Sequence, residues 1–130
     1  MKRDMELVRQ VLLRVESRHI PVGCSLGVGP WDQELSIEGY DADQVGHHMA
    51  MLVDGGFVDS LPADMSGAFQ MKGLTWNGRE FLDAIRSPEI WRRTKDGLGK
   101  VGGWSVDLAW ELAKAYGKQL AKEKLGIDAS

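Results

Sequence analysis

The stretch that decides the fold is residues 41–75, DADQVGHHMAMLVDGGFVDSLPADMSGAFQMKGLT. Asp41 or Asp43 can cap a helix, and the apolar side chains that follow recur at helical spacing. The pair Gly55-Gly56 is typical of the end of an α-helix, where a glycine often adopts the left-handed backbone conformation. Two apolar segments come next, separated by the proline- and glycine-containing residues 60–67. The stretch therefore predicts one helix followed by a two-stranded hairpin.

The residues before this stretch predict a helix, a loop and a strand. Asp4 is a suitable N-cap, and apolar residues from Met5 to Val15 recur at helical spacing, so we expect an amphipathic helix over residues 5–17. The glycine- and proline-rich residues 19–34 are expected to form a loop. Apolar and polar side chains then alternate over residues 35–38, which predicts a short, half-buried strand.

The residues after the hairpin predict further helices. Thr75 can cap a helix that contains Trp76, and Ser87 followed by Pro88 is a typical helix start. Residues 96–103 are rich in glycine and are expected to be a surface loop. A C-terminal helix is expected over residues 105–126, with a serine cap at its start and a glycine at its end.

The resulting fold class is α+β and mostly helical. The order is helix, short strand, helix, two-stranded wing and helix, which is that of a winged-helix domain with extra C-terminal helices. Residues 37–41 leave little room for the first helix of a helix-turn-helix pair, so we expect a degenerate winged helix. We expect residues 1–130 to form a single winged-helix-like domain, of which 105–126 is a C-terminal helix.

Charge is sorted along the chain. The net charge is −3, yet residues 19–71 contain no lysine or arginine in 53 positions. The acidic residues of that segment are Asp32, Glu34, Glu38, Asp41, Asp43, Asp54, Asp59 and Asp64. The flanking segments together carry a formal charge of +5. This uneven distribution of charge bears on which partners the protein binds more than on its fold.

The composition is that of a globular chain, with 43% hydrophobic and 27% charged residues. No apolar run approaches the roughly 20 residues that would cross a bilayer, and the charged start is unlike a signal peptide. Cys24 is the sole cysteine, so no internal disulfide can form. We expect a cytoplasmic protein with no membrane contact.

Two motifs point to a family. The start Met1-Lys2-Arg3-Asp4-Met5 and the run from Leu74 to Arg86, LTWNGREFLDAIR, with Trp91 soon after, resemble the domain-of-unknown-function family 2513. Gly39-Tyr40 and the apolar residues of the central helix occur in the same order as in that family. The resemblance implies a winged-helix-like fold and a phage or prophage setting. It supplies no catalytic residue.

The titratable residues show no pattern of a catalytic or metal site. His47 and His48 would point about 100° apart on a helix and could not both face one metal ion. His48 lies beside apolar positions, which favours a partly buried, hydrogen-bonded side chain over a metal ligand. His19 and Cys24 lie in a glycine-rich loop that fixes no geometry. We therefore expect no enzyme activity, no metal and no cofactor.

The five tryptophans and the basic clusters have ordinary structural explanations. Trp76 and Trp91 are expected to anchor the core, whereas the patterns leave open whether the other three tryptophans are core or interface. Those three are Trp31, Trp104 and Trp110. Lysines at 114, 118 and 122 are expected to form a solvated helix face. Arg92, Arg93 and Lys95 can pair with the acidic segment of the same chain or of a neighbour.

Two functional hypotheses follow. The first is a protein-interaction module that binds an unidentified protein through an acidic surface on the central helix and the wing. We expect that surface to include Asp43, Gln44, His47, Met51, Asp54, Asp59 and Asp64. The alternative is a winged-helix DNA-binding regulator, which would use basic groups such as Lys2, Arg3, Arg9, Arg79 or the Lys114 stripe. The C-terminal helix is also a candidate surface for a homodimer.

Overall fold

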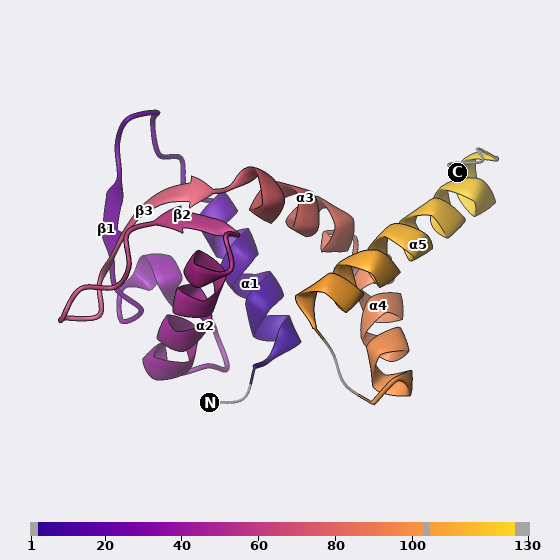
Figure 1. The fold of residues 1–130 in the computed structure, drawn as a ribbon, viewed down its shortest axis with the longest axis horizontal. Coiled ribbons are helices and arrows are strands. Elements are labelled where there is room, and N and C mark those ends of the chain that lie inside the picture. The colour runs from indigo at the N-terminus through magenta and orange to yellow at the C-terminus, as the bar shows by residue number, and fades with distance from the viewer. Residues whose placement is uncertain (1–2, 103–104, 127–130) are drawn as a thin grey trace. The chain divides into compact units, whose positions relative to one another are not determined.

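The computed structural model describes residues 3–102 and 105–126 (Figure 1). Within these residues the fold contains five α-helices, one short 3-10 helix and a three-stranded antiparallel sheet. The predicted α+β, mostly helical class is confirmed. The chain divides into two compact units, Met1–Arg79 and Glu80–Ser130, which are described in turn.

Helix α1, Met5–Glu16, forms where the sequence predicts it. The Asp4 carboxylate accepts a hydrogen bond from the Leu7 backbone N–H at 3.2 Å, which satisfies one of the unpaired donors at the helix start. One face of the helix is fully buried, and its residues are Met5, Leu7, Val8, Val11, Leu12 and Val15. This face packs against α2 and the sheet in the core of the first unit.

The sheet has the order β1-β3-β2, with β1 at Leu26–Val28, β2 at Val58–Ser60 and β3 at Phe69–Leu74. Both pairings are antiparallel, and β2 and β3 form the predicted hairpin. The strand predicted over residues 35–38 is wrong. Leu35 ends the 3-10 helix η1, Gln33–Leu35, and the free edge of β3 is taken by β1. The alternation of apolar and polar residues correctly indicated which side chains are buried, because Leu35 and Ile37 are both buried. These residues nevertheless do not pair with a strand.

Helix α2, Ala42–Asp54, starts with a capping box. The Asp41 carboxylate accepts from the Gln44 N–H at 2.8 Å, and the Gln44 amide oxygen accepts from the Asp41 N–H at 3.0 Å. The helix ends as predicted at the glycine pair, where Gly56 has a φ of +81°. Its buried face comprises Val45, His48, Met49 and Leu52, as the spacing predicts.

The element order of the first unit is helix, strand, 3-10 turn, helix and hairpin. This order resembles that of a winged-helix domain, with the three residues of η1 at the position of the middle helix. Figure 1 shows the three strands beside α1 and α2, with the β2–β3 hairpin extending beyond the helices.

Helix α3, Trp76–Ile85, crosses the boundary between the two units. Thr75 caps it, because its hydroxyl accepts from the Gly78 N–H at 3.0 Å. The expectation that Trp76 anchors the core is wrong, since this side chain is 76% exposed. Phe81 and Ile85 are fully buried, and they lie about 140° and 180° from Trp76 around the helix axis. Trp76 therefore belongs to the solvent face.

The second unit contains α4, Pro88–Lys100, and α5, Val106–Leu125. The surface loop predicted over residues 96–103 is wrong up to Lys100, because α4 continues through Gly97 and Gly99. A Cβ on Gly97 would lie 2.6 Å from the Tyr116 hydroxyl of α5, so the missing side chain allows the two helices to pack closely.

The ends of the two helices of this unit match the sequence-based expectations. Ser87 caps α4 and Ser105 caps α5 through their side chains, and Gly126 ends α5 with a φ of +66°. Trp91 is 3% exposed, which confirms that it is a core residue. Trp110 is half-buried and contacts Phe81 with ring centroids 5.6 Å apart. Trp104, whose place the sequence left open, lies outside the described residues.

Candidate functional site: a groove beside helix α2

The first unit carries a groove of about 430 Å³ between α2, the residues after β1 and the β2–β3 hairpin. Its lining is mostly apolar. The lining residues are Pro30, Trp31, Ala42, Asp43, Gly46, His47, Ala50, Ala63, Ser66, Gly67 and Phe69. We call this the α2–hairpin groove. All of its lining residues belong to the segment that has no lysine or arginine.

Close contacts hold the Trp31 side of the groove in place. A Cβ on Gly29 would overlap the Trp31 indole, and a Cβ on Gly67 of the hairpin would lie 3.3 Å from it. The indole thus rests on the backbone at both positions while remaining 56% exposed. The turn beneath it is fixed by Asp32, whose carboxylate accepts from the Gly29 N–H at 2.8 Å.

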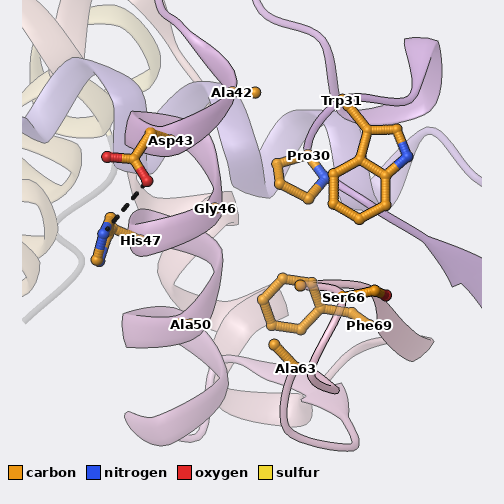
Figure 2. A pocket seen from close by; sticks show the side chains of 11 residues that line it. Pro30, Trp31, Ala42, Asp43, Gly46, His47, Ala50, Ala63, Ser66 and Phe69 are labelled. Carbon is orange, nitrogen blue, oxygen red and sulfur yellow. Dashed lines mark ion pairs between the residues drawn. The ribbon is translucent and has the colours of Figure 1, made fainter.

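Small residues form the α2 wall. Ala42, Gly46 and Ala50 are spaced four apart, which places them on one side of the helix. Pro30 packs against this wall, since a Cβ on Gly46 would lie 3.1 Å from its ring. Figure 2 shows Pro30 and Trp31 on one side of the groove and Ala63, Ser66 and Phe69 on another, with α2 beside them. The helix backbone is therefore unusually accessible from the groove.

Carboxylates lie around the groove. Asp43 pairs with His47 at 3.6 Å, and Figure 2 shows this pair pointing away from Trp31 at the outer side of α2. Asp32 follows Trp31, and Asp64 lies between the lining residues of the hairpin. Hydrogen bonds from the Ser66 hydroxyl and from hairpin backbone N–H groups lower the pKa of Asp64, so it stays ionised. We call Asp32, Asp43 and Asp64 the acidic rim.

The residues predicted as an interaction surface fall into three groups. Asp43 and His47 line the groove, and Asp64 is in the hairpin segment that borders it. Gln44 is half-buried and serves in the capping box of α2. The remaining three residues are Met51, which is half-buried, and Asp54 and Asp59, which are exposed. Like Gln44 and Asp64, they are not among the lining residues.

Sequence reasoning missed the apolar part of this site. The sequence places Pro30 in a loop, leaves open whether Trp31 is a core or an interface residue, and assigns Phe69 only to a strand. A signal did exist, because Ala42, Gly46 and Ala50 repeat at a four-residue spacing in a helix whose other face is apolar. Nothing in the sequence indicated that the hairpin and residues 30–31 would approach the same side of that helix.

His48 lies in the core of the first unit and is 1% exposed. Its Nδ1 donates to the Gln44 carbonyl at 2.8 Å, and its Nε2 accepts from the Asp4 backbone N–H at 2.9 Å, a tautomer assigned from these partners. The Tyr40 hydroxyl donates to the Asp4 carboxylate at 3.0 Å. Burial and this hydrogen bond raise the pKa of Tyr40. The predicted hydrogen bonding of His48 is confirmed, its burial is more complete than predicted, and it links α2 to the start of α1.

The histidines and acidic residues form no metal-binding cluster in the part of the chain that the structure describes. His47 and His48 point to different environments, one exposed and one buried. Cys24 and His19 are both exposed in the segment before β1.

The basic clusters of the second unit contact acidic and aromatic groups of the same unit. Arg93 lies 3.1 Å from Glu89 and 3.7 Å from Glu123. Lys95 lies over the ring of Trp91, and Lys114 lies 5.0 Å from the ring of Trp110. The remaining lysines of the predicted stripe, at 118 and 122, are exposed on α5, as expected for a solvated face.

Comparisons with known proteins identify the class to which this small α+β protein belongs. A family model described as "Hypothetical protein (DUF2513)" matches residues 2–105. The chain therefore belongs to domain-of-unknown-function family 2513, as its motifs indicate. It is 29% identical over 129 residues to an uncharacterised protein of Haemophilus influenzae, a match that covers 96% of this chain and 99% of the relative. No solved structure matches the chain.

Among the described residues, no helix combines the length and the apolar character that crossing a membrane requires.

Proposed function

We propose that this protein is a non-enzymatic binding module that recognises another protein through the acidic surface of its first unit. The observation that carries the proposal is the absence of lysine and arginine from residues 19–71, which include α2, β2 and the tip of the hairpin. Lys72, in the middle of β3, is the first basic residue after this segment. Six of the eight acidic residues in this segment are exposed: Glu38, Asp41, Asp43, Asp54, Asp59 and Asp64.

This charge distribution disfavours nucleic acid as the partner. Neutralisation of phosphates by lysine and arginine supplies most non-specific DNA affinity. In a winged-helix domain the recognition helix and the wing contact DNA. Here α2 and β2 have no lysine or arginine, and the hairpin has a single one, Lys72 in β3. A basic protein surface, in contrast, would be attracted to these carboxylates. The phage or prophage setting implied by the motifs is part of this proposal, because an accessory protein could then occupy a host surface that normally holds nucleic acid.

The proposal is tested by comparing protein capture with DNA binding. The wild-type chain and the double variant Asp43→Asn, Asp54→Asn are used to capture proteins from a bacterial lysate. We expect the wild type to retain a partner that is released as salt is raised, and the double variant to retain less of it. Asp107→Asn is the matched control, because Asp107 is the second residue of α5 as Asp43 is of α2.

DNA binding is measured in parallel by mobility shift with random duplex DNA at about 50 mM salt, where non-specific binding is strong. We expect no shift. A strong, salt-sensitive shift that is lost when Arg9 or Arg79 is neutralised would overturn the proposal in favour of a DNA-binding regulator. A captured protein that is retained equally by the wild type and the double variant would also contradict it.

A further inference from the structure

We propose that the α2–hairpin groove holds a cationic segment of a partner protein, with an apolar side chain of that segment in the groove and its lysine or arginine side chains beside the acidic rim. This inference rests on the proposed function and specifies where the partner binds. It commits to a peptide-like occupant from another protein.

The shape of the groove favours a polypeptide segment. The α2 wall consists of Ala42, Gly46 and Ala50, so an approaching chain meets the helix without long side chains in between. The groove is open to solvent and has few polar groups that converge on one point, unlike a small-molecule site that encloses its ligand. Its volume of about 430 Å³ leaves room for more than one apolar side chain.

Trp31 supplies the anchoring surface. A large aromatic side chain that is 56% exposed, yet held by the backbone at positions 29 and 67, loses little conformational freedom when a partner covers it. Tryptophan is also among the residues that most often dominate binding at protein interfaces. The exposed indole face can receive either an apolar side chain or a cation of the partner.

The charge around the groove favours a positively charged partner segment. Each of the three segments that line the groove carries a carboxylate: Asp32 follows Trp31, Asp64 lies in the hairpin, and Asp43 lies on α2 with its carboxylate at the outer side of the helix (Figure 2). The lining contains no lysine or arginine, and His47, its sole histidine, already contacts Asp43. An acidic or neutral segment would bring no compensating charge to these three carboxylates, whereas lysine or arginine on either side of an apolar residue would.

The experiment selects a random peptide library on the purified full-length chain. We expect the enriched peptides to have net positive charge and at least one large apolar residue, and their binding to weaken as salt is raised. A synthetic copy of the most enriched peptide is then titrated against variants. We expect Trp31→Ala to weaken its binding by about tenfold or more, the loss typical of an interface anchor.

One further groove variant and two matched controls separate loss of the groove from loss of folding. Ala50→Gln narrows the groove from the α2 wall without removing the indole, and it should weaken peptide binding comparably. The matched controls are Trp76→Ala, at a tryptophan outside the groove that is 76% exposed, and Ala115→Gln on the exposed side of α5. Both controls should bind the peptide like the wild type.

The outcomes distinguish this inference from the proposed function. If the enriched peptides are basic and sensitive to Asp43→Asn, but bind the Trp31 and Ala50 variants like the wild type, the acidic surface binds proteins and the groove assignment is wrong. If the peptides are not basic, or none is enriched, both fail. If the wild-type chain self-associates in sedimentation velocity and Trp31→Ala abolishes this, the occupant is a second copy and the inference is overturned.

Discussion

Replacing His48 with leucine tests the hydrogen-bonded link between α2 and the start of α1. The two side chains are similar in size, and leucine is favoured in helices, so neither a large cavity nor helix propensity should dominate. What is lost is the acceptor for the Asp4 N–H at 2.9 Å and the donor to the Gln44 carbonyl at 2.8 Å. Water cannot replace them freely, because position 48 is 1% exposed.

The expected cost follows from these contacts. A buried N–H left without a partner costs about 1–3 kcal/mol. The Gln44 carbonyl keeps its backbone hydrogen bond within the helix, so losing the second hydrogen bond from His48 Nδ1 adds little to the cost. We therefore expect His48→Leu to lower the free energy of unfolding by about 2 kcal/mol. With a urea m-value of about 2 kcal/mol per molar, the unfolding midpoint would fall by about 1 M.

The assay is urea unfolding followed by circular dichroism, with two companion variants. His47→Leu is the matched control, since its side chain is 58% exposed, and it should change stability by less than about 0.5 kcal/mol. His48→Gln carries an amide oxygen that can accept from Asp4 and should recover part of the loss. If His48→Leu unfolds at the wild-type urea concentration, the hydrogen bonds are not what this histidine contributes.

Three further predictions concern positions whose environments differ sharply. Gly97→Ala should destabilise the protein by about 1–3 kcal/mol, because its Cβ would meet the α5 tyrosine hydroxyl at 2.6 Å. Gly99→Ala, in open space on the same helix, should instead raise the thermal midpoint. Trp91→Ala should cost about 3–5 kcal/mol in urea unfolding, whereas Trp76→Ala should cost less than about 0.5 kcal/mol. For Asp64, an NMR titration should give a pKa below its ordinary value of 3.8. Its contribution to stability should be present above that pH and be lost as pH falls through the lowered pKa, and Asp64→Asn should remove this acid dependence.

The helices could be predicted because their local signals agree with their packing. Asp4, Asp41, Ser87 and Ser105 are cap residues in sequence and make the corresponding capping hydrogen bonds in the structure. Where local and tertiary effects compete, the sequence misleads. Gly97 weakens a helix locally, but the close approach of α5 outweighs that cost of about 1 kcal/mol.

The sheet could be predicted only in part. The β2–β3 hairpin is local, so its turn residues and apolar alternation identify it. Strand β1 is three residues long and pairs with β3 more than 40 positions away, which no local pattern encodes. The same limit applies to the groove. Its charge was visible in the sequence, but its apolar lining joins residues 30–31, α2 and the hairpin through tertiary structure alone.

Several acidic residues of the first unit stabilise turns or cap a helix, which is a role in folding and not in binding a partner. Asp32 and Asp64 fix turns, and Asp41 caps α2, so their presence is explained without any ligand. Those tasks do not explain the absence of cations. The chain has 16 lysines and arginines in 130 residues, a frequency that would place six or seven of them in 53 positions, and residues 19–71 have none. Exposed positions such as Gln33 and Gln70 would accept lysine at little cost to folding. Folding therefore accounts for these carboxylates but does not account for the absence of lysine and arginine. A basic partner would explain that absence.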